Sequence, residues 1–147
     1  MKLSHIEHIG IAVNSLKTAI PYYEEMLGLK CYAIEEVADQ KVKTAFFRIG
    51  QTKIELLEST DPEGPIGKFL EKKGEGMHHL CMEVDDIDQK LAELKEKGVR
   101  LINETAEVLP GRKMAFIHPK AGNGVLIELY QLTDWTNKPQ GGNMIIK

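Results

Sequence analysis

The chain has 147 residues, 42% apolar and 28% charged, which is typical of a soluble globular protein with one domain or two small modules. Its formal net charge of -3 provides no basic surface for nucleic acid. The N-terminal MKLSHIEHIG lacks the apolar core of a signal peptide, and no apolar run approaches the roughly 18 residues of a membrane span. Cys31 and Cys81 are isolated, without metal-type spacing, which indicates reduced thiols and a cytoplasmic protein.

The first half of the chain, residues 1–60, has the pattern of a βαβββ module. HIGIAV, at residues 8–13, is rich in β-branched residues and predicts a strand. Apolar residues at helical spacing predict a helix that begins at Asn14 or Ser15 and ends at Gly28, although Pro21 removes one backbone hydrogen bond inside it. Three strand patterns follow: KCYAIEEV (30–37), KTAFFRIG (43–50) and TKIELLES (52–59).

The second half, residues 76–131, repeats this order. HLCMEV predicts a strand, DDIDQKLAELKEKG a helix with an aspartate cap, and VRLINET, KMAFIHP and GVLIELYQ three further strands. A linker at 61–75 holds a short helix near 66–73, and 132–147 has the composition of a tail. Equivalent landmarks recur at separations of 70–73 residues, namely His8 and His79, Gly28 and Gly98, and Glu55 and Glu128. We infer an internal duplication.

Side chains alternate along a strand, so each first strand should present one apolar face to a helix and one histidine face to the opposite side. Gly10, Ala12 and Cys81 share the histidine faces and are small enough to leave room there. His79 is the register partner of His8. The adjacent His78 has the opposite parity, and we expect it to point away.

Four residues form a duplicated set on these faces: His8, Glu55, His79 and Glu128. A carboxylate within an apolar strand is costly to bury, yet it occurs here twice at equivalent positions, each with an equivalent histidine. Two imidazoles and two carboxylates suit a divalent cation with positions open for substrate. The set lacks a thiolate, which disfavours a structural zinc site.

The chain resembles the vicinal oxygen chelate superfamily, and within it the methylmalonyl-CoA epimerase family. The resemblance spans Ser4 to Gln131 and rests on HIGIAV, TKIELLE, GEGMHHLCMEVDDID and above all HPKAGNGVLIELYQ. It implies an α+β fold in which two tandem βαβββ modules form an open, eight-stranded, barrel-like sheet with a metal site in its concave face.

For function, the resemblance implies that (R)- and (S)-methylmalonyl-CoA are interconverted by removal of the α-proton through a metal-stabilised enolate. His8, His79 and Glu128 would bind the metal, and Glu55 would bind it directly or through water. The metal would be cobalt, with nickel, manganese, zinc or magnesium as other candidates. The expected partners are an acyl-CoA substrate and a second copy in a homodimer, with no nucleic acid or membrane.

One position departs from the family pattern. Several epimerases of this family carry a catalytic glutamate in the middle strand, where this chain has Thr44, and threonine cannot abstract a proton from carbon. Glu128 is one expected acid/base group. We hypothesise that Glu55 is the other, because the pseudo-symmetry of the duplication puts Glu55 and Glu128 on opposite sides of the metal.

Two other functions remain open. Lactoylglutathione lyase (glyoxalase I) also uses two histidines and two glutamates, for the isomerisation of a hemithioacetal, but HPKAGNGVLIELYQ favours the epimerase. A non-catalytic ligand-binding member of the same fold would not need the four metal ligands.

Several smaller signals have modest interpretations. Basic residues near the last hairpin, Arg112, Lys113 and Lys120, could meet coenzyme A phosphates, but such residues are usually solvated. His118 is expected to be a turn residue, and Tyr130 shares the face of Glu128, where it lines the pocket or packs in the core.

Overall fold

The computed structural model describes residues 3–133, so most of the expected tail lies outside the described part of the chain. The strands are β1 (Leu3–Val13), β2 (Ala33–Val37), β3 (Val42–Ile49), β4 (Thr52–Ser59), β5 (Gly76–Val84), β6 (Glu107–Leu109), β7 (Arg112–Ile117) and β8 (Leu126–Leu132). The helices are α1 (Leu16–Pro21), α2 (Pro65–Lys73) and α3 (Ile87–Glu96), with a π-helix at Tyr22–Met26 and a 3-10 turn at Ala38–Gln40. The eight strands belong to one sheet, in the order β2-β3-β4-β1-β5-β8-β7-β6, which confirms the predicted α+β class.

The chain divides into two compact units, and the division falls inside β1 and β5. Among the described residues, unit 1 comprises 3–7 and 79–133, and unit 2 comprises 8–78. Each unit contains one histidine and one glutamate of the duplicated set.

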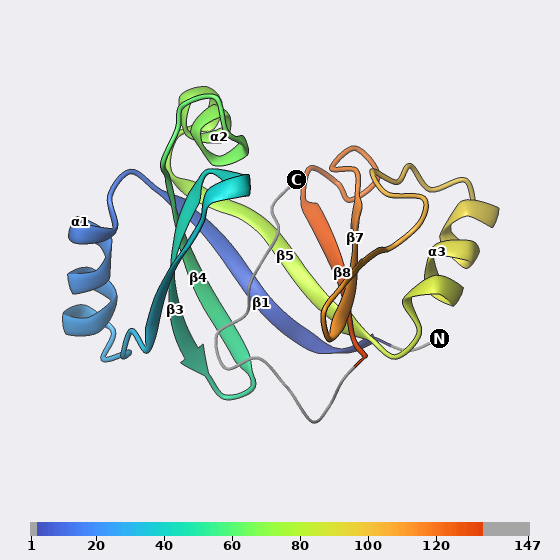
Figure 1. Ribbon diagram of the computed structural model, residues 1–147, viewed down its shortest axis with the longest axis horizontal. Helices are drawn as coiled ribbons and strands as arrows, with labels where there is room; N and C mark the ends of the chain where they lie inside the picture. Colours follow the sequence, from blue (N-terminus) through green and yellow to red (C-terminus); the bar gives the residue numbers. More distant parts are fainter. Residues whose placement is uncertain (1–2, 134–147) are drawn as a thin grey trace. The chain divides into compact units, whose positions relative to one another are not determined.

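In unit 2, β1 runs parallel to β4, and β3 is antiparallel to both β4 and β2. One face of these strands packs on α1, which Figure 1 shows beside β3 and β4. The buried core on this side is apolar and consists of Val13, Leu16, Ala45, Phe47 and Leu56. The alternation of apolar residues in the sequence therefore predicts the helix-covered face correctly.

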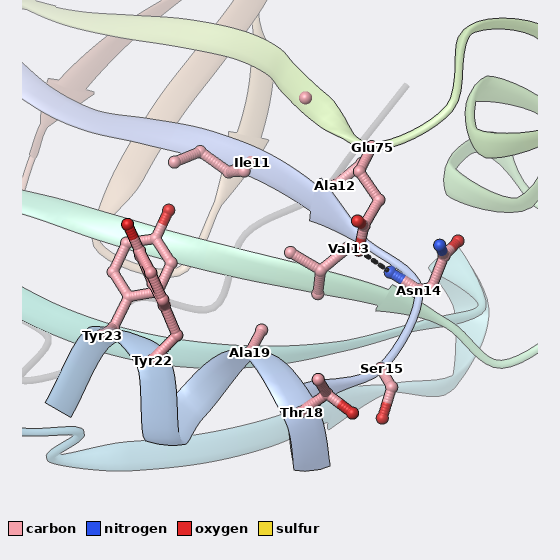
Figure 2. A pocket seen from close by; sticks show the side chains of 11 residues that line it. Ile11, Ala12, Val13, Asn14, Ser15, Thr18, Ala19, Tyr22, Tyr23 and Glu75 are labelled. Atoms are coloured by element: carbon pink, nitrogen blue, oxygen red, sulfur yellow. Dashed lines mark hydrogen bonds between the residues drawn. The ribbon is translucent and has the colours of Figure 1, made fainter. Parts of the chain in front are cut away.

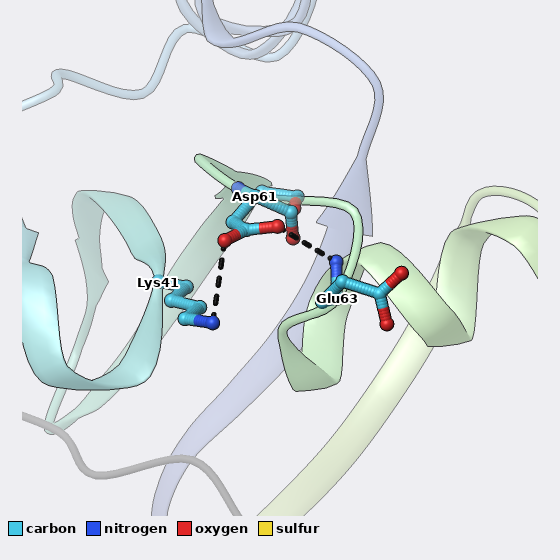
Figure 3. A network of polar contacts seen from close by, with 4 residues as sticks. Lys41, Asp61 and Glu63 are labelled. Carbon is cyan, nitrogen blue, oxygen red and sulfur yellow. Dashed lines mark hydrogen bonds and ion pairs between the residues drawn. The ribbon is translucent and has the colours of Figure 1, made fainter.

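The other face of unit 2 is covered at one end by α2, which matches the short helix expected at 66–73 (Figure 1). Ile66 of α2 is fully buried against Ala12, Val42 and Leu57. The segment before α2 is held by Asp61, whose carboxylate pairs with Lys41 at 3.2 Å and accepts a hydrogen bond from the Glu63 N–H at 2.9 Å (Figure 3). The Glu63 N–H and then Lys41 lower the pKa of Asp61, so this link between the β3 turn and α2 stays ionised at neutral pH.

Unit 1 repeats the arrangement. β5 runs parallel to β8, and β7 is antiparallel to β8 and β6. Helix α3 packs on one face of β7 and β8 (Figure 1), through the buried side chains of Val84, Ile87, Leu91, Ala115 and Leu129. The aspartate cap is confirmed: the Asp86 carboxylate accepts from the Gln89 N–H at 3.1 Å.

The duplication extends to a hydrogen bond at the start of each helix. The Leu16 N–H donates to the Glu58 carboxylate at 2.7 Å, and the Ile87 N–H donates to the Gln131 side-chain oxygen at 2.7 Å. Glu58 and Gln131 each stand three residues after the duplicated glutamate of their module. In unit 2 this contact takes the place of a side-chain cap, because the side chain of the N-cap residue, Ser15, makes no capping hydrogen bond.

One predicted strand is wrong, and the predicted first helix is irregular at its proline. VRLINET is not a strand: only Leu101 forms a bridge, with Ile117, and the Asn103 side chain accepts from the Phe116 N–H at 2.8 Å. This side chain occupies the donor that a continuing ladder would need, so pairing stops and β6 forms later. The first helix is also irregular, since α1 ends at Pro21 and continues as a π-helix, a change that follows from the missing N–H of proline.

Candidate metal and catalytic site

Unit 2 brings His8 and Glu55 together. His8 lies on β1 and Glu55 on β4, where Glu55 is opposite Gly10, so the two are diagonal neighbours on one face. His8 Nδ1 is 3.5 Å from Glu55 Oε2, and the two side chains are 2% and 1% exposed. Gly10, which the sequence placed on the histidine face, is the residue opposite Glu55.

Unit 1 brings His79 and Glu128 together in the same way. Glu128 on β8 is opposite Cys81 on β5, two residues after His79. His79 Nε2 is 3.6 Å from Glu128 Oε1, with side chains 0% and 1% exposed. The sequence therefore predicted both histidine–glutamate pairs within their modules, whereas the role of the residues stays a prediction.

The separation of each pair fits two ligands of one ion better than a direct hydrogen bond. Charge-assisted N–H···O bonds are about 2.7–2.9 Å long, shorter than the 3.5 and 3.6 Å found here. Two ligand atoms roughly 2.0–2.2 Å from a metal ion, at right or tetrahedral angles, lie about 3.0–3.5 Å apart. Among residues 3–133, the histidine, cysteine and acidic side chains whose ligand atoms lie close enough together to hold a metal ion are His8, Glu55, His79, Cys81 and Glu128.

Cys81 is the member of these clusters that the sequence analysis treated only as a small residue. Its Sγ lies within 4.8 Å of a carboxylate oxygen of Glu128, and the residue is fully buried. The signal for it was available, because Cys81 shares the strand face of His79. Its equivalent in unit 2 is Gly10, so unit 1 alone places a thiol beside its glutamate.

Thr44 is buried on the Glu55 face of unit 2, so its hydroxyl offers no carboxylate there. Across the ladder, however, Thr44 is opposite Glu35 of β2. Glu35 Oε2 is buried and has no hydrogen-bond partner among the described residues. Opposed residues point to the same side of a sheet, so a carboxylate reaches this face from the neighbouring strand. The sequence does not indicate Glu35, because alternation along AIEEV puts one glutamate on each face and singles out neither.

The equivalent face of unit 1 carries further polar groups near Glu128. His5 Nδ1 lies 3.4 Å from Glu83 Oε2, and Tyr130 is 7% exposed. Burial raises the pKa of Tyr130 well above its usual range, and Glu7 adds to this more than Arg112 opposes it. The Tyr130 hydroxyl is therefore a hydrogen-bond donor at neutral pH.

The remaining candidate residues have structural contacts. His78 is buried against the Phe69 ring, with centroids 5.0 Å apart, and burial, followed by Lys73, lowers its pKa to about 4. His118 is a turn residue, as predicted, since its Nδ1 accepts from the Lys120 N–H at 3.1 Å. The expectation that Arg112 is solvated is wrong: Arg112 is buried.

Unit 2 also contains a cavity of about 570 Å³ between α1 and the strands (Figure 2). Its lining includes Ile11, Val13 and Tyr23, which belong to the helix-covered face, and the Asn14 N–H donates to Glu75 at its rim at 2.8 Å. Neither His8 nor Glu55 lines this cavity. It is therefore separate from the histidine–glutamate pair of its own unit.

Comparison with known proteins defines the class. Residues 7–116 match the model of the glyoxalase/bleomycin resistance protein/dioxygenase superfamily, and the chain belongs to this superfamily. None of the helices among residues 3–133 is long and apolar enough to span a membrane.

Individual relatives show which members of the superfamily this chain is similar to. The chain is 37% identical to an ethylmalonyl-CoA/methylmalonyl-CoA epimerase of Cereibacter sphaeroides, over 88% of this chain and 99% of the relative. It is 42% identical to YqjC, an uncharacterized protein of Bacillus subtilis, over 86% and 91% of the two chains. A solved structure of methylmalonyl-CoA epimerase in complex with methylmalonyl-CoA superposes with a TM-score of 0.80 at 33% identity, covering 90% of this chain and 96% of that one. The resemblance inferred from the sequence is confirmed.

Proposed function

We propose that the protein is an isomerase that interconverts (R)- and (S)-methylmalonyl-CoA. The observation that carries this proposal is the buried histidine–glutamate pair found once in each unit, at 3.5 and 3.6 Å, in a chain related to epimerases. A single pair supplies two protein ligands, fewer than the three that catalytic zinc sites typically have. We therefore propose that the two pairs, His8 with Glu55 and His79 with Glu128, bind one cation jointly.

The donor set fits such a cation. Neutral imidazole and carboxylate are ligands for cobalt, nickel, zinc and manganese, and burial of two carboxylates becomes favourable when positive charge compensates them. When bound, the cation would supply the charge that stabilises an enolate. Cobalt, a homodimer and a cytoplasmic location are proposed from the resemblance, as is the division into modules at 1–60 and 76–131.

The carboxylates would move the proton. A proton between a thioester and a carboxylate is removed by a base on one face and returned by an acid on the other. We propose Glu128 for one face and Glu55 for the other. Both side chains are 1% exposed, so the packing around them restricts where each carboxylate can lie.

The test is proton NMR of methylmalonyl-CoA in deuterium oxide with the protein as purified. We expect the α-proton signal to disappear as the proton exchanges for deuterium. A chelator should stop this exchange, and added cobalt should restore it. Persistence of the signal with metal bound would exclude the epimerase function. The hemithioacetal of methylglyoxal and glutathione, run in parallel, identifies the lyase activity as the alternative.

A further inference from the structure

The equivalent faces of the two units differ at three positions, which are apolar in unit 2 and polar in unit 1. In unit 2 three apolar residues, Ala12, Val42 and Leu57, pack against Ile66 of α2. Glu83 is the equivalent of Ala12, because each stands four residues after its duplicated histidine, and Tyr130 is the equivalent of Leu57, because each stands two residues after its duplicated glutamate. Arg112 is the equivalent of Val42, because each is paired with the residue four positions after that glutamate. A position closed by a helix in one unit is therefore lined by polar side chains in the other.

Arg112 is the most unusual of these residues because it is a buried cation. It is 7% exposed, and its Nε is buried without a hydrogen-bond partner among the described residues. In residues 3–133 no carboxylate lies within 4.0 Å of the Arg112 guanidinium. Two glutamates of unit 1 have other partners, since Glu83 lies beside His5 and Glu128 beside His79. Arginine remains charged in proteins, so burial without an ion pair is unfavourable unless an anion arrives.

Tyr130 supplies a second donor beside Arg112. Arg112 on β7 is opposite Leu132 on β8, so Tyr130 is its diagonal neighbour on the same face. Glu128 lies two residues before Tyr130 on that face. Along the strand this is about 6.6 Å, which is within the length of a small acyl group and its thioester.

We propose that Arg112 and Tyr130 form a buried subsite for an oxyanion of the acyl-CoA substrate, either its free carboxylate or a phosphate of coenzyme A. The proposal rests on the proposed function for the identity of the substrate. The guanidinium supplies charge and paired N–H donors, and the Tyr130 hydroxyl supplies one further donor. Such a subsite would discriminate substrates that carry the oxyanion from those that lack it.

The competing explanation is that Arg112 stabilises the fold. Arg112→Met removes the charge with little change in length, and Lys113→Met is the matched control. Lys113 adjoins Arg112 on β7 but faces the opposite side, where its Nζ lies 2.6 Å from Asp88. Thermal melting is measured with each variant, with a chelator present, at constant ionic strength, without ligand and with methylmalonate or coenzyme A.

We expect Arg112→Met to melt at or above the wild-type temperature without ligand, because it removes a buried charge that has no ion pair within residues 3–133. At least one probe should stabilise the wild type, and its Kd should rise roughly tenfold or more in Arg112→Met. Lys113→Met should retain wild-type affinity, and Tyr130→Phe should show a smaller loss for the same probe. Loss of the methylmalonate effect identifies the carboxylate, and loss of the coenzyme A effect identifies the phosphate.

Three results would overturn the subsite: a melting temperature several degrees lower in Arg112→Met without ligand, unchanged affinity for both probes, or no stabilisation of the wild type by either. The outcome is separable from that of the proposed function, since the melting assay needs no turnover. If proton exchange fails but binding that depends on Arg112 persists, the subsite belongs to a different acyl-CoA or dicarboxylate reaction.

Discussion

Replacement of Glu55 by glutamine tests whether this residue is the second acid/base group or only a ligand. The change preserves the shape of a side chain that is 1% exposed, and an amide oxygen can still face His8 and a cation. It removes the ability to accept a proton, and a positioned general base contributes roughly 10²–10⁴-fold to a rate. Exchange that begins at Glu55 should therefore slow by about 100-fold or more.

The effect should depend on which epimer is the starting substrate. If Glu128 serves the opposite face, the epimer deprotonated by Glu128 still exchanges its α-proton for deuterium, but it recovers its own configuration. The other epimer should hardly exchange. Proton NMR from each pure epimer in deuterium oxide measures both rates, and metal content, measured in parallel, shows whether the cation site is intact.

Glu35→Gln is the matched control, because Glu35 lies opposite Thr44 on the neighbouring strand. We expect it to leave both exchange rates close to wild type. Equal loss from both epimers in Glu55→Gln would make Glu55 a ligand alone. Asymmetric loss in Glu35→Gln instead would refute the reasoning and transfer the second acid/base role to Glu35.

Two further predictions concern stability. Glu58→Ala and Gln131→Ala each remove the side chain that accepts a hydrogen bond from the first N–H of a helix. Each should lower the free energy of unfolding, measured by urea denaturation, by about 1–2 kcal/mol. A change near zero would contradict the duplicated role. The pKa of His78 is lowered from 6.5 to about 4, so below pH 6.5 the unfolded chain takes up the proton first. The contribution of His78 to stability should be constant above that pH and fall by about 3 kcal/mol between pH 6.5 and 4, and His78→Gln should lack this part of the loss.

The sequence predicted those features that depend on local periodicity and on the repeat. Strand parity placed His8 and Glu55 on one face, and the repeat register gave His79 and Glu128 as their equivalents. Prediction failed where a single side chain intervened across strands. Asn103 accepts the Phe116 N–H that a longer sixth strand would have used, and nothing in VRLINET itself indicates this partner.

Arg112 shows the same limit for the site. From the sequence it is one of several basic residues near a hairpin, and exposure is the ordinary expectation for such residues. Arg112 lies opposite Leu132 and diagonal to Tyr130 on the neighbouring strand, where both residues are buried, and the local pattern around Arg112 does not encode this pairing. Glu35 was missed for a related reason, since only the pairing of β2 with β3 sets it opposite Thr44.

The boundary between the two units inside β1 and β5 has a consequence for dissecting the molecule. A cut in the segment between the two halves, for instance next to Gly74, leaves residues 3–7 on the first fragment although they belong to unit 1. It leaves at least residues 75–78 on the second fragment although they belong to unit 2. Neither fragment then carries the whole of one compact unit. Each half of the internal duplication thus contributes a short segment to the unit that the other half mainly forms, and we expect the two halves, produced separately, to be less stable than the intact chain and to suit a split-protein pair.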